Sequence, residues 1–263
     1  MSQYPTLPAF DALVLAGSRA EVDPMALIDG YRHKSLIEVS GQSMLERVVT
    51  ALRQAGAKRV LVSCNHPDVV ARALELGAEI VQPAGGPSAS VLNALDKTDR
   101  PLIVTTADHA LLQSDWVVSL MEETPRSADF SLMFARSETI EKAVPGSKRT
   151  YYKFADGSWS GCNLFYLRTP AARAVFELWR SAERDRKKPW KLVARLGWRN
   201  LFDYLSGKLT AAQAIARVGD RIGVRASVVC AQDGLAAVDV DKPEDLEAVR
   251  LMLAPQAPQV ALG

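Results

Sequence analysis

The chain of 263 residues is long enough for one large α/β domain, or for one domain with a sizeable insertion. It is 48% hydrophobic and 24% charged, as globular proteins usually are, and no apolar run approaches the roughly 18 residues needed to cross a bilayer. The net charge of +2 favours no nucleic-acid partner. Three widely spaced cysteines without a CxxC pair argue against a disulfide framework or a zinc site. With an N-terminus unlike a signal peptide, they predict a cytoplasmic protein.

The first half of the chain alternates short apolar runs with amphipathic segments. The runs predict strands at Ala12–Ala16, Arg59–Cys64, Glu79–Val81 and Pro101–Thr106, and the segments predict helices at Ser43–Ala55, Pro67–Leu76 and Ser88–Leu95. Apolar strands separated by helices indicate a parallel sheet covered on both faces, whose carboxyl ends meet at one edge. Ligands bind at that edge in open α/β sheets. Gly17 and Asp108, which follow the first and fourth strands, should therefore be neighbours.

The second half is less regular. The pattern predicts strands at Asp129–Arg136, Gly161–Leu167 and Arg225–Cys230, with mostly helical structure from Pro170 to about Val218. The closing stretch AAVDVDKPEDLEAVRLML predicts a strand that passes into a helix. The whole chain is thus predicted to be one Rossmann-like α/β domain with a mostly parallel mixed sheet flanked by helices. Residues from about 137 to 220 should form a hairpin and a basic helical insertion within it.

Basic residues follow the first predicted strand closely. Gly17 lets backbone amides approach a ligand, and Arg19, Arg32 and Lys34 could neutralise a polyphosphate. The stretch is neither a Walker loop nor a dinucleotide fingerprint, because GxxxxGK[ST] and GxGxxG are both absent. A solvated loop with incidental basic residues would have the same pattern.

Three aspartates could bind a divalent cation. Asp108 directly follows an apolar strand and could give one oxygen to Mg²⁺, with water and phosphates completing the octahedron. Asp239 and Asp241 would share one face of a strand by its period of two, and could supply further ligands. Each of these aspartates could instead cap a helix.

A third motif, PAGGPSASVLNAL at Pro83–Leu95, places glycines and small residues at a predicted helix start. Backbone amides at such a position could contact a nucleobase or a ribose.

In combination these motifs resemble the MobA-like nucleotidyltransferase (NTP transferase) superfamily, which is related to sugar-phosphate and methylerythritol-phosphate cytidylyltransferases. The matching segments are Leu15-Ala16-Gly17 with Arg19, His33–Leu36, Val39–Leu45, Ser88–Leu95, Thr106–Asp108 and Asp241–Leu246. The resemblance implies a nucleotide-diphospho-sugar transferase-like fold. It also implies transfer of NMP from an NTP, CTP or GTP first of all, to a phosphorylated small molecule with release of pyrophosphate.

The resemblance assigns roles to particular residues. It implies that Lys34 and Arg19 are catalytic, that Asp108 and Asp241 bind magnesium, and that Asp239 is the second choice for that role. The nucleotide-binding residues that it implies are Leu15, Ala16, Gly17, Ser18, Gly85, Gly86, Ser88, Ser90 and Asn93. Ser18 stands where the family usually has a second glycine, and the loop from Gly17 to Lys34 is longer than the family's, so the loop could fold over the nucleotide as a lid.

Two segments could contact the acceptor. Lys148–Leu167 could form a hairpin that presents Arg149, Lys153 and Asn163 to an anionic acceptor, although a hairpin with core aromatics fits equally. Arg180–Arg199 holds eight basic residues against two acidic ones. This segment could rest on the anionic inner face of the membrane, contact a phosphorylated substrate, or be a solvated helix face. The phosphorylated acceptor itself could be a lipid head-group precursor.

Two other functions remain open at this point. A nucleotide-sugar glycosyltransferase would share the architecture, and Asp239-Val240-Asp241 spells its DxD motif, but that motif normally follows the mid-chain strand. A non-catalytic nucleotide-binding protein would fit Ser18 and the long loop.

Overall fold

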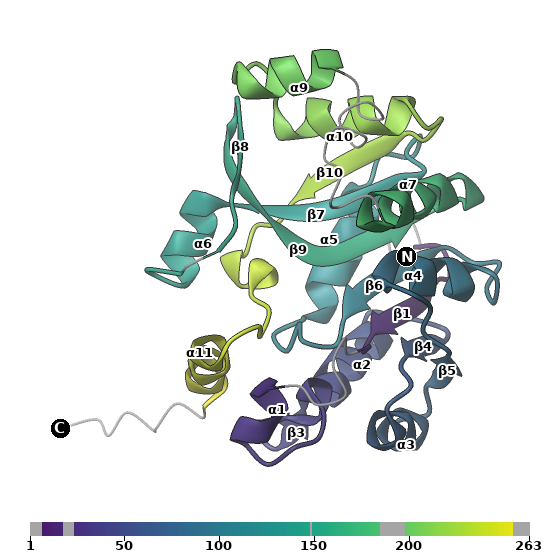
Figure 1. The fold of residues 1–263 in the computed structure, drawn as a ribbon, viewed down its shortest axis with the longest axis vertical. Coiled ribbons are helices and arrows are strands. Elements are labelled where there is room, and N and C mark those ends of the chain that lie inside the picture. Colours follow the sequence, from purple (N-terminus) through teal and green to yellow (C-terminus); the bar gives the residue numbers. More distant parts are fainter. Residues whose placement is uncertain (1–6, 18–23, 148, 185–197, 255–263) are drawn as a thin grey trace, which may run out of the picture.

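The computed structural model describes residues 7–17, 24–147, 149–184 and 198–254 (Figure 1). Its strands are β1 (Asp11–Leu15), β2 (Glu38–Val39), β3 (Gln42–Ser43), β4 (Val60–Ser63), β5 (Glu79–Val81), β6 (Leu102–Thr106), β7 (Phe130–Arg136), β8 (Tyr152–Phe154), β9 (Gly157–Leu167) and β10 (Ala226–Cys230). Its α-helices are α1 (Pro24–Ile28), α2 (Met44–Gln54), α3 (Pro67–Glu75), α4 (Pro87–Leu95), α5 (Ser114–Glu123), α6 (Ser137–Ala143), α7 (Arg173–Arg184), α9 (Trp198–Leu205), α10 (Ala211–Asp220) and α11 (Pro243–Leu253). Short 3₁₀ helices are η1 (Lys34–Leu36), η2 (Pro170–Ala172) and η3 (Gly234–Ala237).

Eight of the described strands form one mixed sheet in the order β10-β7-β9-β6-β1-β4-β5, with β8 paired to β9. The strands β6, β1, β4 and β5 are parallel, as their continuous apolar sequences predict. Leu15 pairs with Thr106, and the Ala107 N–H donates to the Leu15 carbonyl at 3.0 Å. The carboxyl ends of β1 and β6 are therefore neighbours, which confirms the expected edge.

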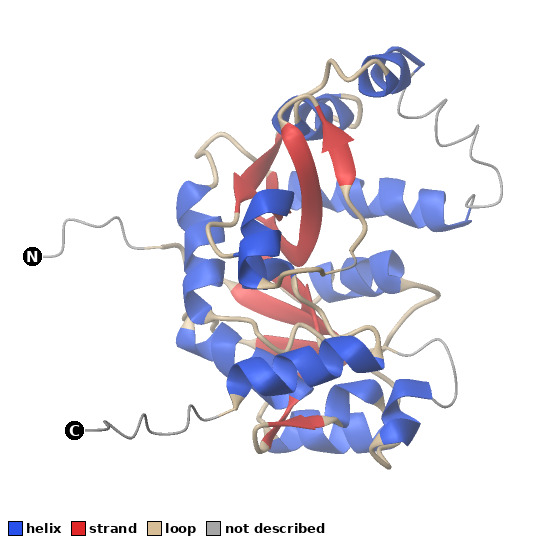
Figure 2. Ribbon diagram, turned by 90° about the vertical axis from the view of Figure 1, so that its left-hand side faces the viewer, coloured by secondary structure: helices blue, strands red, loops and turns tan. Residues whose placement is uncertain are grey.

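The strand β9 lies antiparallel between β6 and β7, so the predicted hairpin is built into the middle of the sheet. Helices cover both faces (Figure 2). One face packs on α2, α3, α5 and α11, and the other packs on α4 and α7, in two separate clusters of buried side chains. Strands whose side chains are apolar on both faces of the sheet must be covered on both faces, as they are here.

Local sequence signals set several helix starts. Ser43 caps α2, because its side chain accepts the Glu46 N–H at 3.2 Å. Pro67 and Pro243 stand in the first turns of α3 and α11, where a missing N–H costs nothing. The Asp245 carboxylate accepts the N–H groups of Asp241 and Lys242 at 3.0 and 2.9 Å and fixes the start of α11.

Three features differ from the sequence predictions. The helices α5 and α6 were not predicted, and the predicted strand before α11 is wrong, because residues 238–241 are irregular. Of the basic segment 180–199, residues 185–197 lie outside the described residues, so its predicted surface role stays untested. No helix in the described ranges is long and apolar enough to span a membrane.

Candidate active site

Lys34 lies between two carboxylates at the carboxyl edge of β1 and β6. Its Nζ is 2.7 Å from Asp108 Oδ2 and 3.2 Å from Asp241 Oδ1. The turn η1 presents the lysine, and His33 caps that turn by accepting the Ser35 N–H at Nδ1. The Val240 N–H donates to the Asp108 carbonyl at 3.0 Å, which brings the late segment 239–241 to the end of β6. Three segments distant in sequence thus meet at one cation.

The electrostatics of this cluster keep Lys34 charged. Burial acts to lower the pKa of Lys34, but the carboxylates of Asp108 and Asp241 outweigh it and raise the pKa above its ordinary value. Lys34 therefore remains an ammonium at neutral pH. A fixed, partly desolvated ammonium is suited to neutralising charge on a phosphate.

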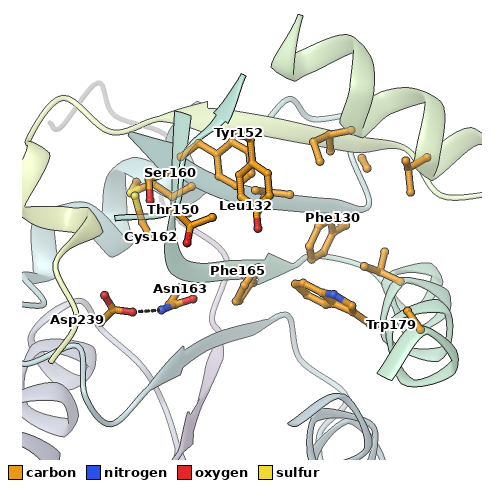
Figure 3. A pocket seen from close by; sticks show the side chains of 18 of the residues that line it. Phe130, Leu132, Thr150, Tyr152, Ser160, Cys162, Asn163, Phe165, Trp179 and Asp239 are labelled. Carbon is orange, nitrogen blue, oxygen red and sulfur yellow. Dashed lines mark hydrogen bonds between the residues drawn. The ribbon is translucent and has the colours of Figure 1, made fainter. Parts of the chain in front are cut away.

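A second ion pair lies beside the first. Arg149 Nη2 is hydrogen-bonded to Asp239 Oδ1, and Asn163 Nδ2 donates to Asp239 Oδ2 at 2.8 Å (Figure 3). Burial raises the pKa of Asp239, Arg149 opposes this shift, and the nearby Asp241 and Asp108 carboxylates add to it. Two of the three predicted acceptor residues are thus brought together, while Lys153 lies exposed on β8.

A bulge in β9 explains the position of Asn163. Leu132 pairs with Phe165 and Phe134 with Gly161, so one residue of β7 faces three residues of β9. Asn163 has a φ of 48°, a left-handed conformation that asparagine tolerates better than most residues. Bulges of this kind re-aim a side chain, here toward Asp239.

The predicted strand geometry of Asp239 and Asp241 is wrong for the same reason that the strand is absent. The two carboxylates contact different partners, Arg149 and Lys34, rather than one another. Within the described ranges no three Asp, Glu, His or Cys side chains are close enough to hold a metal by themselves. This separation also weighs against a DxD motif that binds a nucleotide sugar through a shared metal.

Two carboxylates nevertheless suit magnesium, which commonly takes one or two protein oxygens plus water and substrate phosphates. Asp108 Oδ1 is buried and has no hydrogen-bond partner among the described residues. Buried polar atoms without partners are uncommon in folded proteins. The donor chemistry of Asp108 and Asp241 therefore fits a hard divalent cation.

Gly17 directly follows Ala16 at the same edge, where an added Cβ would meet no atom of the described residues within 4 Å. The open space at Gly17 leaves room for a ligand against the backbone after Leu15 and Ala16. Ser18 and Arg19 lie outside the described residues, so their predicted roles stay predictions.

The α4 loop is held by its own side chains. Ser90 Oγ accepts the Ala84 N–H and donates to the Gly86 carbonyl, both at 3.0 Å, and Asn93 donates to the Gln82 carbonyl at 3.4 Å. Ser90 and Asn93 therefore shape the predicted nucleotide loop, which includes the exposed Gly85.

Sequence reasoning missed Glu183, which reaches the start of α4 from α7. Its carboxylate accepts the Ser88 hydroxyl at 2.8 Å and lies 2.7 Å from where a Cβ on Gly86 would be. A single glutamate in a basic helical segment carries no local signal for this contact. Only the packing of α4 on α7 produces it.

A cavity of about 750 Å³ opens next to the ion pairs. Arg149, Asn163, Asp239 and Asp241 line its polar part, and aromatic side chains including Phe130, Phe165 and Trp179 line the rest (Figure 3). A cavity of this size and composition is typical of a small-molecule site.

The family model of the MobA-like NTP transferase domain matches residues 12–196. The chain belongs to this family. It is therefore a nucleotidyltransferase enzyme, with the charged cluster at the edge where the fold places its ligands. The match continues past Asp108 into the hairpin and α7, where the sequence motifs themselves are sparse.

Named relatives agree with the family. The chain is similar to the 3-deoxy-manno-octulosonate cytidylyltransferase of Actinobacillus pleuropneumoniae serotype 7 (strain AP76), at 23% identity over 84% of this chain and 93% of that protein. A hypothetical transferase from Thermus thermophilus has a similar structure, with a TM-score of 0.77 and 29% identity over 90% of this chain and 99% of that one.

Two further solved structures share the fold. The 4-diphosphocytidyl-2C-methyl-D-erythritol synthase of Anaerococcus prevotii DSM 20548 has a TM-score of 0.59 at 10% identity, covering 94% of this chain and 99% of that one. A CMP-2-keto-3-deoxy-manno-octonic acid synthetase complexed with CTP has a TM-score of 0.56 at 16% identity, covering 94% and 98%.

Proposed function

We propose that this enzyme transfers a nucleoside monophosphate from CTP or GTP to a phosphorylated small molecule, with magnesium as cofactor and pyrophosphate as leaving group. The observation that carries the proposal is the Lys34 ammonium held between Asp108 and Asp241 at the carboxyl edge of β1 and β6. That edge is where an open α/β sheet binds its ligand. A cation and two carboxylates are the groups that a polyphosphate and a hard metal ion require there.

The reaction asks the protein mainly for position and charge. An oxygen of the acceptor phosphate attacks the α-phosphorus, a new P–O bond forms, and the bond from that phosphorus to the bridging oxygen of pyrophosphate breaks. Lys34 remains protonated and stabilises the negative charge that builds on the phosphoryl oxygens. Magnesium bound by Asp108 and Asp241 would offset charge on the triphosphate. The acceptor phosphate is already ionised, so no protein base is needed.

The nucleotide would bind over Gly17 and the start of α4. Gly17 would leave the backbone open to phosphates, and the backbone around Gly85 and Gly86 at the start of α4 would contact a base or ribose. The named curated relative and two of the structural neighbours are cytidine-nucleotide enzymes, which supports CTP as the first nucleotide to test.

The acceptor would bind at Arg149 and Asn163. Arg149 is mostly buried, its Nε has no hydrogen-bond partner among the described residues, and its remaining N–H groups can donate to a phosphate. The pair lies beside Asp241, and hence beside the expected position of the α-phosphorus.

Pyrophosphate release tests the proposal. Each of the four NTPs is incubated with magnesium and a panel of phosphorylated acceptors, including sugar phosphates and alkyl phosphates. The proposal expects release that depends on both substrates and disappears in Lys34→Ala. Lys58→Ala is the control and should keep it, because Lys58 is an exposed lysine just before the amino end of β4. Release with no pair of substrates would contradict the function.

A further inference from the structure

The cavity beside Arg149 is larger and more apolar than a polar acceptor needs. Its volume is about 750 Å³, and most of its lining comes from aromatic and aliphatic side chains of β7, β9, α7 and α10. Sites of this size bind molecules larger than a phosphate or a simple sugar phosphate. Figure 3 shows Asp239 and Asn163 on one side of the cavity, away from Trp179, and Asp241, which also lines it, contacts Lys34.

The apolar wall is preformed. Phe165 packs edge-on against Trp179 with ring centroids 5.4 Å apart, and it stacks on Phe130 at 6.3 Å. Tyr152 and Trp179 line the cavity and remain 48% and 42% exposed. Large aromatic side chains left partly exposed in a hollow are characteristic of a ligand site.

The polar end of the cavity contains a hydrogen-bond donor, Arg149 Nε, that could bind an anion. Asp239 is paired with Arg149 and Asn163, Asp241 with Lys34, and Asp245 with two backbone N–H groups. Arg149 Nε is buried without a partner among the described residues. Since the neighbouring carboxylates already have partners, this guanidinium can donate a hydrogen bond to one more anionic oxygen.

We propose that the acceptor is amphiphilic: a phosphate group binds at Arg149, next to the reacting end of the nucleotide, and an apolar body fills the cavity between α7 and α10. The phosphate oxygen then attacks the α-phosphorus as described above, and the apolar body only positions it. This inference rests on the proposed function for its chemistry, but its binding step can be measured without any nucleotide.

The experiment is a binding series with the full chain. Methyl, butyl and octyl phosphate are titrated by calorimetry, and the emission of Trp179 is followed in parallel. Each buried methylene should raise affinity about four-fold. We expect octyl phosphate to bind at least about 100-fold more tightly than methyl phosphate. The gain is smaller than for seven fully buried methylenes, because part of the octyl group remains near the open end of the cavity.

Two variants separate the cavity from a non-specific apolar surface. Ala182→Trp fills the cavity from α7, whereas Ala171→Trp places the same side chain on the exposed start of η2. Ala182→Trp should remove most of the gain from methyl to octyl phosphate, and Ala171→Trp should leave it. Trp179→Ala removes a wall without adding bulk and should also weaken octyl phosphate, so the test survives if Ala182→Trp does not fold.

The outcomes distinguish this inference from the proposed function. Affinities that do not rise with alkyl length, or that rise equally in Ala182→Trp, would overturn the proposal of an amphiphilic acceptor. They would mean that another part of the protein or a protein partner covers the cavity. Pyrophosphate release with polar acceptors but never with octyl phosphate would also overturn it. Tight octyl phosphate binding with no release from any NTP would contradict the proposed function and leave the cavity assignment standing.

Discussion

In residues 11–110, which we name the nucleotide half, the strands β1, β4, β5 and β6 are all parallel, and the exposed chemistry lies at their carboxyl ends. In residues 129–230, the acceptor half, β9 runs antiparallel to its neighbours and the chemistry lies along a sheet face, where aromatic side chains form a cavity. Segment 239–241 joins the two halves, because Asp241 contacts Lys34 of the first and Asp239 contacts Arg149 of the second. One continuous sheet thus places charged side chains at the strand ends of one half and an aromatic cavity on a face of the other.

The largest effect should come from Lys34, the cation of the nucleotide half. Lys34→Ala removes a charge needed most as the phosphoryl group is transferred, so the single-turnover rate should fall about 10³-fold, about 4 kcal/mol, while NTP affinity changes much less. Lys34→Arg should restore little, because a planar fork cannot replace a compact ammonium between two carboxylates. Rapid-quench kinetics and calorimetric NTP binding check both parts. Equal losses in rate and affinity would make Lys34 a binding residue only.

Asp108 tests the metal directly. Asp108→Asn should slow turnover about 100-fold, about 3 kcal/mol, and should reduce the gain in CTP or GTP affinity that magnesium gives to the native enzyme. Asp68→Asn, an exposed aspartate in the first turn of α3, is the matched control. A magnesium dependence of nucleotide binding that is the same in Asp108→Asn and the native chain would contradict the assignment of Asp108.

Sequence reasoning succeeded where the signal is local. The apolar strands β1, β4, β5 and β6, the helices α2, α3, α4 and α11, and the meeting of β1 with β6 all follow from periodicity and from the handedness of parallel connections. Lys34, Asp108 and Asp241 were predicted to share one site from their places at strand ends and from the family resemblance, and the structure brings them together.

The contacts that sequence reasoning missed depend on distant packing. A DVD pattern reads as two side chains on one strand face, but the backbone N–H of Val240 binds the Asp108 carbonyl and the strand does not form. The contact between Asp239 and Arg149 spans 90 residues, and that between Glu183 and Ser88 spans 95. The position of Asn163 depends on a bulge whose only sequence signal is an asparagine that tolerates positive φ.

The acceptor half should draw part of its stability from one ion pair, whose carboxylate on Asp129 is buried and whose guanidinium on Arg225 is exposed. Asp129 accepts hydrogen bonds from Arg225 Nε and Nη2 at 2.9 and 2.8 Å and from Thr169 at 2.9 Å, tying β7 to the start of β10. The Arg225 hydrogen bonds hold the pKa of Asp129 well below its usual range. Asp129→Asn should therefore lower the free energy of unfolding at pH 7, by about 1 kcal/mol because solvent screens the exposed guanidinium.

The pH dependence of that loss has a definite sign. A depressed folded pKa stabilises the native state above the unfolded value, near pH 4, and this stabilisation is lost as the pH falls toward the folded pKa. Urea unfolding should show the difference between Asp129→Asn and the native chain shrinking below about pH 4, whereas Asp220→Asn, an exposed site on α10, should show none at any pH. A difference that is constant with pH would mean that shape, not charge, is what Asp129 supplies.

One substitution can be compared in the two halves, beginning with Gly219 in α10. A Cβ there would lie 2.3 Å from the Val224 carbonyl oxygen and 2.8 Å from Ala226 Cβ, so α10 would have to move off β10. Gly219→Ala should lower the free energy of unfolding by about 2 kcal/mol and leave NTP affinity unchanged. Thermal unfolding and calorimetry measure the two effects. Unaltered stability would mean that α10 packs more loosely than the structure shows.

Gly17→Ala is the matched change in the nucleotide half, with the smallest expected effect. An added Cβ meets no atom of the described part of the chain within 4 Å, so we expect no clash to relieve and a stability that matches the native value. If the triphosphate lies against this backbone, the same methyl group contacts a phosphate, and NTP affinity should fall about 5- to 10-fold, about 1 kcal/mol. The same glycine-to-alanine change would then have different effects at the two sites. Gly219→Ala would change only stability, and Gly17→Ala would change only NTP affinity. If Gly17→Ala binds NTP as tightly as the native chain, the phosphates do not lie against the end of β1. Lys34 would then contact them at a position away from Gly17.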